Sequence, residues 1–220
     1  MIVIRGYAKV WDQLSRDGAM GSSDKPGYWI RGSLTKQLSS GKLVTLHRGH
    51  EGPVLARTDN LSLELFEDHH GLGFEAHVFP QETPAIWDSL NDIRLGLGVS
   101  TENVAMKAYP VMRNGKEVLE VREASIVHLA MLTEPNYASC CCWLANSPRR
   151  YDSDKAFRIN AARDEWDIGY RAHRAAPSPA PTPRPRQHVT LRAFGMACEF
   201  TPAAWRAYNH AHEMLRRKRR

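Results

Sequence analysis

The chain has 220 residues, of which 42% are hydrophobic and 25% charged, so it has enough apolar residues for one globular core with an extension and is neither collagen-like nor wholly disordered. No apolar run approaches the roughly 20 residues needed to cross a bilayer, and a charge at Arg5 comes too early for a secretory signal, so we expect an intracellular protein without a membrane partner. Residues 1–150 carry 16 Lys and Arg against 17 Asp and Glu, whereas residues 151–220 carry 14 against 7. The net charge of +6 therefore belongs to the C-terminal part and not to the core.

Strands are predicted through most of the first 145 residues, because apolar and polar side chains alternate there. The opening strand covers residues 2–10. A hairpin is expected from the alternating segments 61–65 and 72–78, and a second hairpin turns at Asn114 and Gly115, a dipeptide that favours tight β-turns. Many short antiparallel strands with few helices predict a mainly β fold, either a small barrel or a sandwich with helical additions.

One helix is expected among the strands. Thr83 provides its N-cap and Pro84 its first turn, and apolar residues then recur at helical spacing until Gly96 and Gly98 end it.

A proline-rich segment divides the chain. Proline occupies every second position between residues 177 and 185, which favours an extended polyproline spacer. We therefore expect a folded domain at residues 1–146, a linker with the spacer at residues 147–186, and a basic tail at residues 187–220 that forms a helix from Thr201.

The cysteines do not predict a disulfide framework. Cys140, Cys141 and Cys142 are contiguous, and Cys198 is the only other cysteine, which fits a reducing compartment. We expect the three contiguous thiols to pack as small hydrophobic groups rather than to react.

Metal and cofactor sites are not expected either. The histidines at positions 47, 50, 69 and 70 are not part of an HExxH helix, and the cysteines lack CxxC spacing. The two glycines at 96 and 98 follow a helix instead of a strand, so they do not form a dinucleotide-binding motif.

Candidates for nucleophilic catalysis come from separate segments. Ser100 follows Gly96 and Gly98, which allow backbone to pass close to a substrate and leave the serine at the edge of a strand; the alternative is a serine in a turn. His50 follows an apolar strand and enters a glycine-flanked loop; the alternative is a solvated loop histidine. A serine hydroxyl needs a base within hydrogen-bond reach, so these two residues are the candidate pair.

Several segments occur in an order that is typical of a known family. They are Arg5-Gly6-Tyr7-Ala8, His50-Glu51 before Pro53-Val54-Leu55-Ala56, residues 68–74, Leu95-Gly96-Leu97-Gly98-Val99-Ser100, and residues 121–127 ahead of Glu134-Pro135-Asn136. Over residues 2–146 the chain resembles the caudovirus prohead serine proteases. This resemblance implies an assemblin-like antiparallel β-barrel with surrounding helices, and a serine endopeptidase.

The resemblance also implies partners and a location. The expected substrates are phage scaffold and major capsid proteins and the chain itself, and the expected location is the host cytoplasm, inside the procapsid during assembly. Self-association and weak contact between the basic tail and nucleic acid are further expectations.

The resemblance assigns site residues as well. The family's histidine falls on His50, with His47 as the competing position, its serine falls on Ser100, and its acidic position falls on Glu123, which we expect to orient His50. Many members follow the serine with a residue, a glycine and an aromatic, whereas this chain has Thr101-Glu102-Asn103. That departure supports an alternative function, a catalytically inactive relative that acts in capsid assembly or scaffolding.

Overall fold

The computed structural model describes residues 1–16, 25–94, 96–135, 137–149, 154–176, 189–193 and 196–200. The chain forms two compact units, Met1–Ala176 and Pro177–Arg220. The proline spacer and the helix expected from Thr201 both lie outside the described residues. In the second unit the structure describes an antiparallel hairpin of β10 (Val189–Ala193) and β11 (Met196–Phe200).

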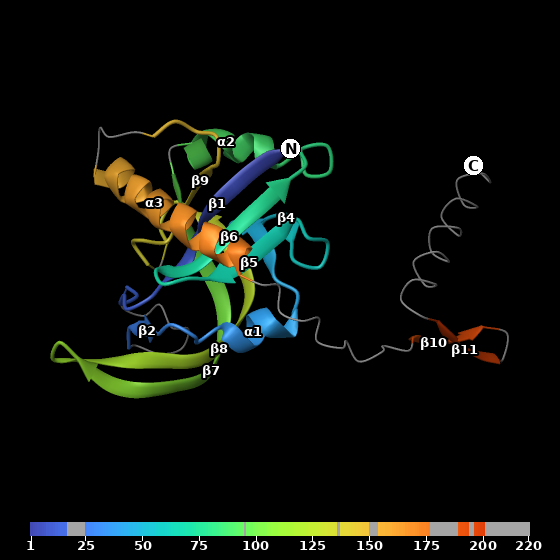
Figure 1. The fold of residues 1–220 in the computed structure, drawn as a ribbon, viewed down its shortest axis with the longest axis horizontal. Helices are drawn as coiled ribbons and strands as arrows, with labels where there is room; N and C mark the ends of the chain where they lie inside the picture. The colour runs from blue at the N-terminus through green and yellow to red at the C-terminus, as the bar shows by residue number, and fades with distance from the viewer. Residues whose placement is uncertain are drawn as a thin grey trace. The chain divides into compact units, whose positions relative to one another are not determined.

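The first unit is built on one nine-stranded sheet. Its strands are β1 (Ile2–Val10), β2 (Gly27–Trp29), β3 (Thr45–Arg48), β4 (Val54–Arg57), β5 (Leu63–Glu67), β6 (Gly71–Val78), β7 (Leu97–Arg113), β8 (Lys116–Leu132) and β9 (Cys141–Leu144). The spatial order is β4-β3-β8-β7-β9-β1-β6-β5, with β2 paired to β8 outside this path. The sheet curls into a nearly closed barrel, which confirms the predicted mainly β fold (Figure 1).

Most strand pairs are antiparallel, as expected, but β8 has two parallel neighbours. Its early residues pair with β2 and its late residues with β3. On its other side β8 pairs antiparallel with β7 over almost its whole length. β8 thus links β3 to β7, and this adjacency decides which side chains meet at the site described below.

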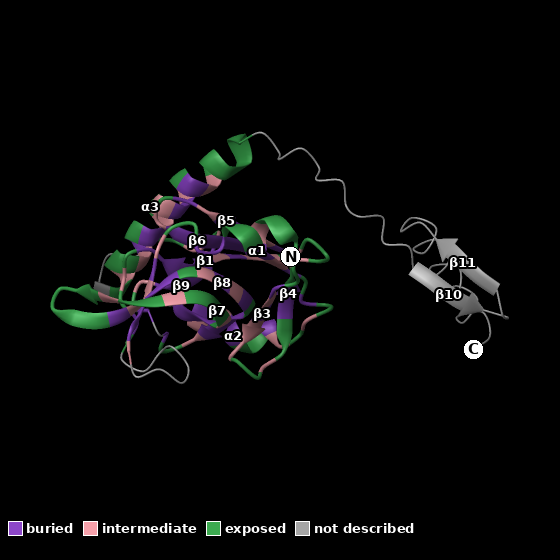
Figure 2. Ribbon diagram, turned by 90° about the horizontal axis from the view of Figure 1, so that it is seen from below, coloured by how far each residue is buried: buried purple, intermediate pink, exposed green. Residues whose placement is uncertain are grey.

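The barrel interior is filled by large apolar side chains from alternate strand positions. The largest that are almost inaccessible to solvent include Trp29, Phe66, Phe74, Leu46 and Leu129. Burial of such side chains stabilises a fold by about 1.5–3 kcal/mol each. Figure 2 shows the buried residues concentrated in the barrel, and exposed residues along the outer part of the β7–β8 hairpin.

The β7–β8 hairpin extends well beyond the barrel (Figure 1). Asn114 and Gly115 form its turn with φ angles of 49° and 76°, which confirms the predicted turn. Register shifts follow Glu102 and Ala105, so the ladder is irregular just beyond the first residues of β7. These first residues belong to the barrel, and the later ones form the projecting arm.

In the described part of the first unit, three helices accompany the barrel: α1 (Thr35–Ser40), α2 (Ile86–Arg94) and α3 (Asp154–Ala175). α2 confirms the helix predicted after Thr83. α3 lies in the segment 147–186, which we expected to be a linker, yet it contacts β1, β5, β6 and β9 and belongs to the first unit. Its sequence is mostly polar and buries only a narrow stripe, which includes Ala162 and Trp166, so its helical pattern is weak in the sequence.

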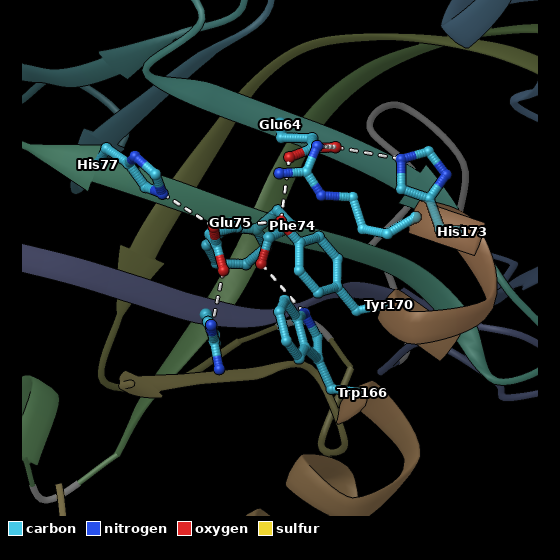
Figure 3. Close-up of polar contacts among 9 residues, drawn as sticks. Glu64, Phe74, Glu75, His77, Trp166, Tyr170 and His173 are labelled. Carbon is cyan, nitrogen blue, oxygen red and sulfur yellow. Dashed lines mark hydrogen bonds and ion pairs between the residues drawn. The ribbon is translucent and has the colours of Figure 1, made fainter. Parts of the chain in front are cut away.

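Polar and aromatic contacts attach α3 to the sheet (Figure 3). The Trp166 indole donates to the carbonyl oxygen of Phe74 at 3.2 Å, and the Tyr170 hydroxyl lies 3.2 Å from carboxylate oxygens of both Glu64 and Glu75. Arg5 donates to Glu75 at 2.9 Å and places its guanidinium 4.5 Å from the Trp166 ring. These contacts explain why α3 docks although its apolar stripe is narrow.

No helix in the part of the chain that the structure describes is long and apolar enough to span a bilayer.

Candidate active site

Three neighbouring strands bring the candidate residues together. Ala130 of β8 pairs with Ser100 of β7 on one side and with His47 of β3 on the other. His128, two residues earlier on β8, pairs with Glu102 of β7. Since residues two apart on a strand share a face, Ser100, Glu102 and His128 lie on one face of the sheet, and His128 is a diagonal neighbour of Ser100.

This face is the outer face of the barrel. Val99, Leu129 and Met131 alternate with the polar positions and are fully buried in the core, so the polar positions point the other way. Ser100 is nevertheless only 3% exposed, so neighbouring segments cover it.

Gly98 shows which segment approaches this strand. A Cβ at Gly98 would lie 2.3 Å from the Pro135 ring, so only glycine lets the segment around Pro135 pack against β7 two residues before Ser100. Gly96 has φ of 82°, and a Cβ there would lie 2.1 Å from Ile159 of α3. We expected these two glycines to leave space for a substrate, but in this structure Pro135 and Ile159 fill the space beside them.

A turn after β3 places His50 against β8. Gly49 adopts φ of 74° and donates its N–H to the carbonyl oxygen of Met131 at 3.1 Å. Arg48 holds the same turn, because its guanidinium donates to Asp92 at 3.0 Å and to the carbonyl oxygen of Met131 at 3.0 Å. His50 is therefore positioned by a backbone turn that is anchored at both β8 and α2.

Two imidazoles and a carboxylate form a continuous chain at this point. His50 Nδ1 lies 2.9 Å from His128 Nε2, and His128 Nδ1 lies 3.1 Å from Glu102 Oε2. The other ring nitrogen of His50, Nε2, has no hydrogen-bond partner among the described residues. The chain thus ends in an imidazole nitrogen that is able to accept a proton.

His47 is differently engaged. Its Nδ1 lies 2.9 Å from the carbonyl oxygen of Gly52 and its Nε2 lies 2.7 Å from the Thr45 hydroxyl. A carbonyl oxygen only accepts, so Nδ1 carries a proton, and in the neutral ring Nε2 accepts from the hydroxyl. With both nitrogens occupied, His47 is less suited than His50 to act as a base, although its ring centroid lies 4.8 Å from that of His128.

The surroundings favour the neutral form of His128. Burial lowers its pKa, the neighbouring His47 and His50 lower it further, and Glu102 opposes them, with a net pKa below the ordinary value of 6.5. Near neutral pH His128 is therefore an uncharged imidazole, with one nitrogen that donates and one that accepts.

Glu123 lies elsewhere on β8. It pairs with Lys107 in the β7–β8 ladder, and its carboxylate lies 2.8 Å from Lys36 Nζ and 3.1 Å from Lys107 Nζ. Five residues separate it from His128, or roughly 16 Å along an extended strand. The two lysine contacts lower the pKa of Glu123, and among the described residues its carboxylate makes no contact with a histidine.

Sequence reasoning nominated neither His128 nor Glu102 for this site, although the two lie 3.1 Å apart. His128 lies alone in an apolar strand, a pattern that usually indicates a histidine in the core. The available signal was weak: His128 is a single polar residue among the apolar residues at the end of β8, and Glu102 lies two residues after the candidate serine, on the same face of β7.

The contiguous cysteines pack as expected. All three are buried and none forms a disulfide. Burial raises the pKa of both Cys140 and Cys142 to about 12, so these thiols stay protonated and unreactive. The described residues contain no group of His, Cys, Asp and Glu side chains arranged to hold a metal ion.

A serine on a strand next to two hydrogen-bonded imidazoles, with a carboxylate 3.1 Å from the second imidazole, is an arrangement typical of serine hydrolases. A sequence model of the family described as caudovirus prohead serine protease matches residues 1–139. This match covers more than half of the chain, so the protein belongs to that family, and its class is serine peptidase. Its role is that of a prohead protease, which places it inside the phage procapsid and in contact with capsid or scaffold proteins. No curated protein matches the chain.

Proposed function

We propose that this protein is a prohead maturation endopeptidase in which Ser100 is the nucleophile and His50 is the general base. The observation that carries the proposal is the 2.9 Å contact between His50 and His128, since it holds a proton acceptor next to the strand that bears the only candidate serine of the family motif. His128 takes the orienting role that we expected from Glu123.

The residue types define the reaction steps. The Ser100 hydroxyl attacks the carbonyl carbon of a peptide bond while its proton moves to Nε2 of His50. The same proton then passes to the departing amine, which breaks the C–N bond and leaves an acyl-enzyme. Water, deprotonated by His50, attacks the ester and releases the acid product, and the proton returns to Ser100.

The proposed substrates are the scaffold and major capsid proteins of the procapsid and this chain itself. Residues 177–220, outside the barrel unit, contain the spacer and the basic tail, which suits them to dock the peptidase on assembling protein or to hold nucleic acid weakly. Cleavage within this region would release the barrel unit from its attachment.

A pair of matched variants tests the proposal. The wild type, Ser100→Ala and Ser125→Ala are co-produced with the scaffold and capsid proteins of the same phage, and cleavage is followed by intact mass. Ser125 lies on β8, paired with Val104 on the projecting arm, so it controls for loss of a hydroxyl on the same hairpin. We expect cleavage by the wild type and Ser125→Ala and none by Ser100→Ala, with all three folded; cleavage by Ser100→Ala overturns the proposal.

The inactive relative remains the alternative because of the Thr101-Glu102-Asn103 departure. A fluorophosphonate that modifies activated serines distinguishes the two functions. Labelling of Ser100 in the assembled procapsid supports the peptidase, whereas an unlabelled Ser100 in the presence of scaffold and capsid proteins supports an assembly role.

A further inference from the structure

We propose that Glu102 is a positioning residue of this site, which acts through His128 to fix where the protons lie on both imidazoles. The inference rests on the proposed roles of Ser100 and His50 and adds a fourth residue to them. It also gives a role to the residue at which the chain departs from the family pattern.

The placement of Glu102 follows from the strand register. Glu102 lies two residues after Ser100 on β7 and directly opposite His128 on β8. Directly opposed side chains have Cβ atoms about 5 Å apart, which a glutamate spans easily, and its Oε2 lies 3.1 Å from His128 Nδ1. The side chains of Thr101 and Asn103, on either side of Glu102, contact each other at 3.1 Å. Of the three residues, Glu102 is the one whose side chain contacts His128.

The ion-pair contact of Glu102 and the hydrogen bond between the two imidazoles together favour one set of proton positions. An ionised carboxylate only accepts, so its position 3.1 Å from Nδ1 of His128 favours the tautomer with the proton on Nδ1. A neutral His128 then has an unprotonated Nε2, which accepts from Nδ1 of His50. The remaining nitrogen of His50, Nε2, is left without a proton, and this is the state that a general base for Ser100 requires.

The charge of Glu102 acts in the same direction. When the Ser100 proton moves to His50, a positive charge appears on the imidazole pair, and a carboxylate at its far end stabilises that charge. The His128 side chain is only 10% exposed, whereas that of Glu102 is 59% exposed. Solvent therefore screens the carboxylate, and we expect its effect to be moderate.

The first experiment measures acylation of Ser100 by a fluorophosphonate between pH 5 and 9 in the full-length protein. The reagent forms a Ser100 Oγ–P bond and releases fluoride, so its rate reports activation of the serine and needs no peptide substrate. The variants are Glu102→Gln, Glu102→Asp and the control Glu117→Gln, which removes a carboxylate from the far part of the same hairpin, where it pairs with Lys25.

We expect Glu102→Gln to lower the plateau rate by about tenfold, Glu102→Asp to restore part of it, and Glu117→Gln to leave it unchanged. The groups that face His128 are His47 and His50 from β3 and the following turn and Glu102 from β7. Glu102 is the one that favours protonation, so its loss shifts the acid limb of the profile to lower pH. Structural loosening would instead rehydrate His128 and shift that limb to higher pH, which would overturn the inference.

The second experiment reads the tautomers directly and does not depend on activity. Nitrogen-15 NMR of labelled imidazoles should show the proton of His128 on Nδ1 in the wild type and in Ser100→Ala, and mixed tautomers in Glu102→Gln. An Nε2 proton on His128 in the wild type overturns the inference even if Ser100 is reactive. Conversely, an unreactive Ser100 with the expected tautomers rejects the proposed function and leaves the positioning contact intact.

Discussion

Two regions of the barrel carry histidine–carboxylate networks, and they differ in how the networks end. Under α3, Glu75 contacts Arg5, His77 and Tyr170, so its carboxylate is held by partners on three sides (Figure 3). The second network, on β7, β8 and the turn after β3, passes from Glu102 through His128 to His50 and ends at an imidazole nitrogen that has no partner in the described part of the chain.

We interpret the first network as structural and the second as the proposed catalytic one. A carboxylate that is saturated by cations and hydroxyls holds a helix on a sheet, since every group in it is already paired. A chain that ends in an unpaired base beside a serine has capacity for proton transfer. The number of histidine and acidic residues in a network therefore does not show whether it could be catalytic. The presence of an imidazole nitrogen without a partner, such as Nε2 of His50, is more informative.

The largest expected effect comes from breaking the proposed catalytic network. We expect His50→Ala to reduce the rate of acylation by a fluorophosphonate roughly 10⁴-fold, because Ser100 loses its base. The free energy of unfolding, measured by urea titration, should stay close to the wild-type value, since His50 is exposed in a loop. A variant that keeps its reactivity would assign the base to another group, with His47 the first to test.

Removing Trp166, which packs over the structural network, should reduce stability and leave the reactivity of Ser100 unchanged. Trp166→Ala removes a side chain that is 1% exposed and leaves a cavity under α3, so we expect a loss of about 3–5 kcal/mol in the free energy of unfolding. Acylation of Ser100, measured well below the unfolding midpoint, should be unchanged. A large loss of reactivity in the folded variant would show that α3 supports the site as well as the barrel.

A smaller effect with a defined pH dependence is expected at Glu75. Burial alone would raise its pKa, but His77 and Arg5 outweigh burial and hold the pKa below the ordinary value. The stabilisation is therefore present above the unfolded-state pKa of about 4.3 and is lost as the pH falls through the lower pKa of the folded state. Glu75→Gln should cost about 2 kcal/mol near neutral pH.

The contribution of the Glu75 charge is tested best at low pH. The difference in unfolding free energy between the wild type and this variant should shrink as the pH falls from 5 to 3, and urea titrations at each pH measure it. A difference that is constant over this range would mean that the Glu75 charge contributes nothing, and that only the shape of the side chain matters.

The smallest effect is expected at Glu123. Its contacts with Lys36 and Lys107 are surface ion pairs, which contribute little in water. Glu123→Gln should therefore keep the rate of acylation within about twofold of the wild type. A loss of reactivity comparable to that of His50→Ala would contradict this expectation. It would mean that Glu123, as the family resemblance implies, and not His128, orients His50.

Local patterns predicted much of this fold. Alternation indicated the strands, Asn114 and Gly115 indicated the long hairpin, and Thr83 with Pro84 indicated α2, because these signals depend on a few neighbouring residues. The segment of α3 gave only a weak helical pattern and was assigned to the linker, since a polar helix becomes stable only where Trp166 and Tyr170 find partners on the sheet.

The site shows the same limit. Motif order by itself indicated the family and nominated Ser100 and His50, because these residues lie in local segments of recognisable composition. The third and fourth residues that we propose, His128 and Glu102, depended on the register of β3, β8 and β7, which pairs these two residues and places Glu123 beside lysines. Register is a long-range property set by the packing of the whole barrel, and a shift by one residue would move every one of these side chains to the other face of the sheet.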